Sequence, residues 1–117
     1  IEKIRLDETP DAWLELETLN ISGNLLSALP EGILRSTKLR RLYAAFNKLT
    51  FEGIPSGVGK LLQLEVLHLA HNELELVPEG LSRCVKLQQL RLNHNRLITL
   101  PEGLYLLPDL KLLDLNE

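Results

Sequence analysis

Apolar residues in the middle of the chain follow two spacings, one after the other. Leu64, Leu67 and Leu69 come first, and the last two alternate with a single residue, as in a short strand with one buried face. The later apolar positions are more widely spaced and are accompanied by Pro78 and Gly80. Because proline and glycine mark turns, we predict that the strand ends in a bend and that the chain returns along another side. The full set is Leu64, Leu67, Leu69, Leu74, Val77, Leu81, Cys84 and Leu87, with Asn72 between the third and fourth.

This pattern recurs along the chain with a nearly constant period. Leu64 and Leu87 are 23 residues apart, and the other full copies have the same length with one exception. The copy that begins at Leu39 has 25 residues, because two are inserted within the segment TFEG. The pattern defines four full repeats at residues 16–38, 39–63, 64–86 and 87–109, after the end of a partial repeat at 1–15 and before the start of a further one at 110–117.

The repeating unit L-x-x-L-x-L-x-x-N-x-L-x-x-(V/L)-P is the pattern of a leucine-rich repeat. It predicts an α/β solenoid, with a parallel β-sheet on the concave face and short helices or irregular turns on the convex face. Because a repeat buries its apolar side only against a neighbour, we expect the chain to be a piece of a longer solenoid. Its terminal repeats should be the least ordered.

Composition narrows the function further. The 117 residues carry a net charge of -3, which does not suggest a nucleic-acid or membrane-surface binder. No apolar run has the length of about 18 residues that a transmembrane helix needs, and no signal peptide opens the chain. Cys84 is the single cysteine, which favours a reducing compartment. It occupies an apolar slot of its repeat, so we expect an inert core thiol rather than a nucleophile.

One asparagine recurs in every full repeat, at the point where the chain bends away from the strand. Backbone groups at such a bend lack sheet partners, and a side-chain amide can satisfy them because it offers two donors and an acceptor. We therefore predict structural roles for Asn24, Asn47, Asn72 and Asn95. Pro30, Pro55, Pro78 and Pro101 follow, each with a glycine two residues later, as turn residues of the convex side.

Before the first full repeat, Trp13 stands three residues ahead of Leu16, a slot that later repeats fill with Ser36, Leu61, Cys84 and Leu107. We predict a core role for this tryptophan. Ile4 or Leu6 could fill the apolar position before the turn, and Pro10 predicts an irregular first turn.

The exposed side of the predicted sheet carries the candidate binding residues. Stacked strands are about 4.8 Å apart, so equivalent positions of successive repeats form rows. Aromatic and arginine side chains on a rigid sheet are typical of protein-binding hot spots. The candidates are Arg41, Tyr43, Phe46, His68, His71, Arg91 and His94, with Tyr43 and Phe46 expected to flank Ala45 on the exposed side of one strand. The alternative is that each side chain only packs on its neighbours in the row.

The histidines of this face suggest two further properties, metal binding and a dependence on pH. His68, His71 and His94 could hold a metal ion, but the sequence offers no nearby cysteine or acidic residue to complete a tetrahedral set, so we predict no metal and no cofactor. Three histidines on one face would make binding there depend on pH between roughly 6 and 7.

The first exposed strand position alternates in sign through Glu17, Arg40 and Glu65, which predicts a ladder of ion pairs. No catalytic motif is present, and we predict a non-enzymatic protein.

The segment LRRLYAAFNKLTFEGIPSGVGKLLQLEVLHLAHNELELVPEGLSRC, followed by NRLITLPEGLYLLPDLKLLDL, resembles the leucine-rich-repeat region of the flightless family, the gelsolin-related actin regulators. The insertion in NKLTFEGIPSGVGKL is its most specific part. The resemblance implies a module that binds coiled-coil partner proteins, in a cytoplasmic, cytoskeleton-associated protein that also occurs in the nucleus. It implies actin binding only through gelsolin-like segments that this sequence does not contain.

Two other functions stay open. LTFEGIPSGVGKLLQL also resembles the repeats of plant receptors, and Asn20-Ile21-Ser22 is a glycosylation sequon that matters only in a secreted protein. Against extracellular ligand recognition, the other three repeats have a plain LPxx(L/I) ending, and a glycan on Asn20 would stand in the middle of the concave sheet. The third function is a structural spacer with no ligand on this segment.

Overall fold

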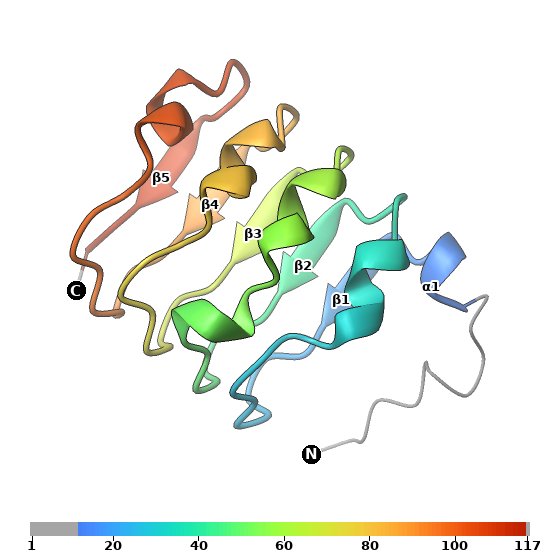
Figure 1. Ribbon diagram of the computed structural model, residues 1–117, viewed down its shortest axis with the longest axis horizontal. Helices are drawn as coiled ribbons and strands as arrows, with labels where there is room; N and C mark the ends of the chain where they lie inside the picture. Colours follow the sequence, from blue (N-terminus) through green and yellow to red (C-terminus); the bar gives the residue numbers. More distant parts are fainter. Residues whose placement is uncertain (1–11, 117) are drawn as a thin grey trace.

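The computed structural model describes residues 12–116, which form a single parallel sheet with a return segment between each strand and the next (Figure 1). Its strands are β1 (Thr18–Asn20), β2 (Arg41–Tyr43), β3 (Val66–His68), β4 (Gln89–Arg91) and β5 (Leu112–Asp114), in the order β1-β2-β3-β4-β5. Leu42 lies opposite Leu67, and Leu67 opposite Leu90, so the leucines of successive repeats form one buried row. The predicted leucine-rich-repeat solenoid is confirmed.

The return side consists of short helical turns. They are α1 (Ala12–Glu15) and the 3-10 helices η2 (Glu31–Arg35), η3 (Phe51–Gly53), η4 (Ser56–Lys60), η5 (Glu79–Arg83) and η6 (Glu102–Leu106). Pro30, Pro55, Pro78 and Pro101 immediately precede four of them with extended backbone, at φ between -64° and -59°. Proline fixes φ in this range and lacks the N–H that a first helical turn leaves unpaired, so each proline is suited to start its turn.

The inserted residues form an element of their own. η3 lies between the bend and η4, in the one repeat with 25 residues. A Cβ atom on Gly53 would overlap the backbone of Ser27 and Ala28 in the preceding repeat, so only glycine fits here. The insertion therefore packs against the first repeat, where the backbone N–H of Leu29 donates to the Gly53 carbonyl at 2.9 Å.

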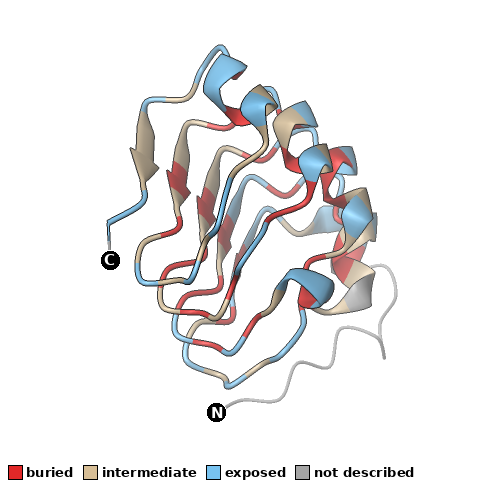
Figure 2. Ribbon diagram, turned by 60° about the vertical axis from the view of Figure 1, so that its left-hand side comes forward, coloured by how far each residue is buried: buried red, intermediate tan, exposed pale blue. Residues whose placement is uncertain are grey.

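The core lies between the strands and the return side (Figure 2). Leu64, Leu67 and Leu87 are fully or almost fully buried, and each such side chain contributes about 1.5 to 3 kcal/mol of hydrophobic stabilisation. Cys84 is also buried, and burial raises the pKa of its thiol to about 11. Its Sγ contacts the Val58 carbonyl oxygen at 3.6 Å. The thiol is therefore a core group, as the repeat pattern predicts.

Trp13 closes the core next to η2. Its side chain is 2% exposed, in agreement with the predicted core role. Gly32 makes room for the indole, since a Cβ atom there would come within 2.5 Å of the ring atoms Cε2 and Nε1. The residues Ile4, Leu6 and Pro10, for which the sequence also makes predictions, lie outside the described residues. No helix within residues 12–116 is long and apolar enough to cross a membrane.

Candidate protein-binding face

One face of the sheet turns away from the helical turns of the return side (Figure 2). We call this surface the sheet face and define it by Arg41, Tyr43, Val66, His68, Gln89 and Arg91. Strand residues alternate between this face and the core, so Leu42 is buried while Arg41 is exposed. The register places Tyr43 opposite His68 and His68 opposite Arg91, and all three are half-buried. Three adjacent strands thus bring an aromatic ring, an imidazole and a guanidinium into one row.

Contacts along this row hold the side chains in place. The Tyr43 and His68 rings lie with centroids 6.4 Å apart and planes tilted by 56°. Arg91 Nη1 lies 3.6 Å from Asp114 Oδ2 on β5, an ion pair whose side chains keep 38% and 20% of their surface exposed. Each anchor therefore does pack on its neighbours, yet keeps accessible surface for a partner.

His68 is the group of this row whose proton affinity is changed. Its pKa is lowered from the ordinary value of 6.5, first because the ring is partly buried and then because of the positive charge of Arg91. His71 lowers it further, while Asp114 raises it. At neutral pH the imidazole is neutral, so the row carries the positive charge of Arg91 next to two uncharged rings.

Phe46, His71 and His94 form a second group, which we call the ring stack. The ring centroids of Phe46 and His71 are 4.2 Å apart and their planes differ by 10°. His71 and His94 are 4.1 Å apart with planes differing by 14°. All three residues have left-handed backbone, with φ of 57°, 59° and 60°. Each stands just before the asparagine of its repeat, so one ring per repeat is added to the stack.

The prediction for the side chain between these two groups was wrong. Ala45 was expected on the exposed side with Tyr43 and Phe46, but it is 4% exposed, and Ala70, the equivalent residue of the next repeat, is 1% exposed. β2 ends at Tyr43, and the chain enters the bend before it reaches Ala45. The strand alternation therefore no longer applies. The ring stack lies at the bend beyond the strands, separate from the row of Tyr43, His68 and Arg91.

The stacking could not be derived from the row alone. Gly23, Phe46, His71 and His94 stand at equivalent positions of their repeats, but the repeat pattern does not predict that the rings lie face to face. That arrangement requires left-handed backbone at each of them. The signal was Gly23, which has φ of 75° in the same slot, since glycine commonly marks a position with positive φ.

The four repeat asparagines lie beneath the bends. Asn47 Oδ1 accepts hydrogen bonds from the backbone N–H groups of Asn24 at 2.9 Å and Leu26 at 3.0 Å. Its Nδ2 donates to the carbonyls of Ile21 at 3.0 Å and Ala44 at 3.1 Å, so one amide serves two repeats. Asn72 and Asn95 repeat the arrangement, accepting from Leu49 and Leu74 respectively. These bonds fix the bends that carry the ring stack.

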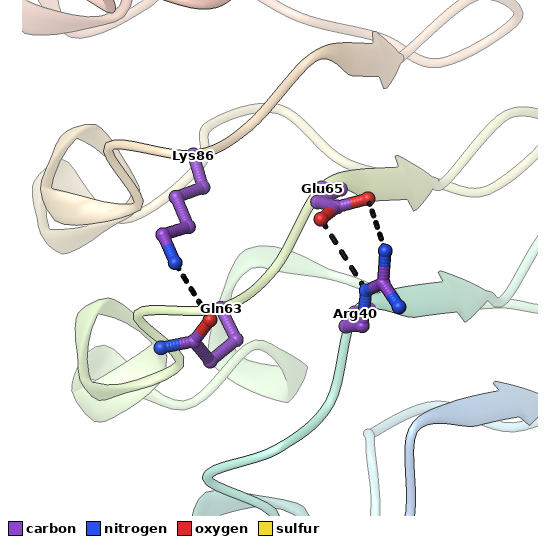
Figure 3. A network of polar contacts seen from close by, with 4 residues as sticks. All are labelled: Arg40, Gln63, Glu65 and Lys86. Carbon is purple, nitrogen blue, oxygen red and sulfur yellow. Dashed lines mark hydrogen bonds and ion pairs between the residues drawn. The ribbon is translucent and has the colours of Figure 1, made fainter.

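A charged edge runs beside the strands (Figure 3). Arg40 Nε donates to Glu65 Oε2 at 3.3 Å, and Lys86 Nζ donates to Gln63 Oε1 at 2.9 Å. Of the predicted alternating row, Arg40 and Glu65 are the pair that forms within residues 12–116. The Arg40–Glu65 ion pair is accessible to solvent, where such a pair contributes about 0 to 1 kcal/mol. No group of three or more histidine, cysteine, aspartate and glutamate side chains suited to a metal ion occurs in the described part.

Comparison with known proteins shows which proteins this repeat architecture is similar to. Family models described as leucine-rich repeats match residues 51–97 and 15–36. The flightless-1 homolog of Caenorhabditis elegans is 77% identical over 31 residues, which is 26% of this chain and 2% of the relative. Flightless-1 of Drosophila melanogaster is 64% identical over 39 residues, which is 33% of this chain and 3% of the relative. The chain is a leucine-rich-repeat domain, and its short stretches of high identity with flightless-1 proteins support a place in the flightless family.

Other relatives match this flightless-type domain over longer stretches at lower identity. Human podocan-like protein 1 is 45% identical over 64 residues, which is 53% of this chain and 12% of that protein. The chain thus spans between 2% and 12% of the length of these three relatives.

Solved structures agree with the fold. Listeria monocytogenes InlP superposes with a TM-score of 0.75 at 27% identity, covering 86% of this chain and 28% of that one. The ectodomain of the Arabidopsis receptor kinase HAESA, solved in complex with a peptide hormone ligand, gives 0.72 at 33% identity and covers 86% and 18%. Leucine-rich repeats are typically non-enzymatic scaffolds that bind protein partners.

Proposed function

We propose that this flightless-type domain binds a partner protein through its sheet face and has no catalytic role. The observation that carries the proposal is the row of Tyr43, His68 and Arg91 on three adjacent strands, with Arg41 exposed beside it. Tyrosine and arginine are the residues that most often dominate protein-protein binding energy. No described helix covers this side of the sheet (Figure 2).

The contacts within the row support binding rather than mere packing. Arg91 is held by Asp114, and Tyr43 is held against His68, so these side chains lose little conformational freedom when a partner docks. The loss of rotamer freedom is one of the main costs of association, about 0.5 to 1.5 kcal/mol for each immobilised side chain. A pre-ordered row on a parallel sheet avoids much of it.

The partner we propose is a coiled-coil protein, as the flightless resemblance implies. A helical partner with acidic and apolar side chains would place them against Arg41, Arg91 and Tyr43. The setting we propose is cytoplasmic and cytoskeleton-associated, with a nuclear pool. Actin would be bound only by gelsolin-like segments outside this sequence.

The test compares two double variants with matched chemistry. Tyr43→Ala with Arg91→Ala removes the sheet-face anchors. Tyr105→Ala with Arg83→Ala removes the same residue types from the return side, where Tyr105 is 63% exposed on η6 and Arg83 is exposed on η5. Each protein is checked for folding by circular dichroism. It is then used to capture proteins from lysate, and the captured protein is purified and titrated by calorimetry.

We expect a coiled-coil protein that binds the wild type and the Tyr105, Arg83 variant equally and loses at least about tenfold in affinity for the Tyr43, Arg91 variant. Equal binding to all three would exclude the sheet face. Loss only in the Tyr105, Arg83 variant would place binding on the return side. If no protein binds any of them specifically, the segment acts as a spacer.

A second candidate is recognition of an extended peptide in an extracellular setting. It is favoured by the match to the HAESA ectodomain, whose structure contains a peptide hormone ligand. Asn20 of the sequon is exposed at the end of β1, and its Oδ1 accepts a hydrogen bond from the Ser22 N–H at 3.1 Å. Secretion from cultured cells followed by a glycosidase mass shift at Asn20 would support this candidate, and an unmodified protein confined to the cytoplasm would exclude it.

A further inference from the structure

The ring stack ends on one side at a position without a side chain. Phe46 contacts His71 with one face of its ring, and the opposite face is directed toward the first repeat. The equivalent residue of that repeat is Gly23, which has the same left-handed backbone as the three stacked residues. A Cβ atom built on Gly23 would have no atom of the described residues 12–116 within 4 Å, so none of them fills the position that follows Phe46 in the stack. Phe46 is 58% exposed, which agrees with this free ring face.

The spacing of this open site suits a planar ring. Successive rings of the stack are 4.2 Å and 4.1 Å apart, and the same step beyond Phe46 leads to Gly23. Aromatic rings commonly stack in parallel, offset planes at centroid distances of about 4.5 to 7 Å, and the rings of this stack lie slightly closer together. A fourth ring at the same spacing would lie beside Gly23, which has no side chain to displace. Leu25, two residues after Gly23, is 65% exposed and is therefore an accessible apolar side chain close to Gly23 in sequence.

We propose that Gly23 and the free face of Phe46 form a slot for one aromatic side chain of the protein partner. This inference rests on the proposed function, because it names the chemistry of a residue that the partner supplies. The residues adjoining Gly23 in sequence are Ser22, Asn24 and Leu25, and none of them carries a charge that would favour a cation over an aromatic ring. An aromatic ring gains both the stacking on Phe46 and the apolar contact with Leu25.

The protein offers its own substitute for the bound ring. Histidine occupies the equivalent position at His71 and His94 with φ near 60°, so Gly23→His uses a conformation that histidine already adopts twice in this fold. Its imidazole would fill the slot by extending the ring stack. Gly23→Ala introduces the same Cβ and the same backbone constraint but leaves the ring space open. The two variants therefore separate filling of the slot from any effect on the backbone.

The experiment is an NMR titration with N-acetyl-tryptophanamide as the probe, with N-acetyl-leucinamide and N-acetyl-argininamide as comparators. We expect the tryptophan amide to shift the Phe46 ring and the residue 23 amide signals in the wild type and in Gly23→Ala. In Gly23→His the affinity should fall at least about tenfold.

The proposal is overturned if the tryptophan amide leaves the Phe46 signals unmoved, if it binds Gly23→His as well as Gly23→Ala, or if the leucine or arginine amide binds equally well. This titration contains no partner protein. Its result is therefore independent of the capture experiment. If the Tyr43, Arg91 variant still binds the partner in that experiment, only the proposed function is overturned.

Discussion

The side-chain oxygen of Asn47 accepts a hydrogen bond at 2.9 Å from the backbone N–H of Asn24, the equivalent asparagine one repeat earlier. Successive bends are thus joined by a side chain rather than by strand pairing alone. Asn47 is 7% exposed, so water cannot replace these bonds. A buried N–H that loses its acceptor retains the full cost of its desolvation.

Asn47→Ala should lower the free energy of unfolding by about 2 to 4 kcal/mol, because two backbone N–H groups lose their acceptor and several carbonyls lose a donor. Urea denaturation measures this. Asn24→Ala is the control: Asn24 is only half-buried and its Nδ2 donates to Ile21 and Ser22 within its own repeat, so a smaller loss is expected. Equal losses would show that bonds between repeats add nothing.

Gly32→Ala should destabilise the chain by about 1 to 3 kcal/mol, since the new methyl group would overlap the indole of Trp13, a large rigid side chain that is 2% exposed. Gly57→Ala is the matched control in the next repeat. Its Cβ would meet the Leu34 Cδ1 methyl at 3.1 Å, and a leucine end can turn aside. Thermal unfolding followed by Trp13 fluorescence compares the two, and an equal shift in Tm would contradict the role of the indole.

The strands could be predicted from sequence because a leucine at every second position must be buried, and the equivalent places of Leu42, Leu67 and Leu90 in their repeats then set the register. The burial of Ala45 could not be predicted in this way. It depends on where the strand ends, and no residue in the pattern marks that point. The stack of Phe46 and His71 likewise depends on the backbone conformation at the bend, for which Gly23 was the available indication.

Cys84 should resist thiol reagents in the native protein. Burial raises the pKa of its thiol to about 11, whereas an unfolded chain has a cysteine pKa of roughly 8.5. At neutral pH the reactive thiolate is then at least about 100-fold scarcer in the folded state, and the side chain is also fully buried. Ellman's reagent should react at least about 100-fold more slowly in buffer than in denaturing urea, with Cys84→Ser as the blank. Rapid reaction in buffer would contradict the core assignment.

The charges facing His68 should change its pKa in opposite directions. Arg91→Gln removes a positive charge and should raise the pKa of His68, while Asp114→Asn removes a negative charge and should lower it. Because partial burial is the largest cause of the lowered pKa, the value in Arg91→Gln should still lie below 6.5. NMR titration of the His68 imidazole measures both variants, and an unchanged pKa in both would show that these charges are screened by solvent.

The same lowered pKa of His68 predicts how stability depends on pH. Above pH 6.5 the imidazole is neutral in both the folded and the unfolded chain, so it contributes no pH dependence. As the pH falls below 6.5, the unfolded chain binds a proton before the folded chain does. The free energy of unfolding therefore decreases until the pH reaches the folded pKa. In urea denaturation, His68→Gln should lose less stability than the wild type between pH 7 and pH 5. If the wild type instead gains stability relative to the variant on acidification, the pKa of His68 is raised and not lowered.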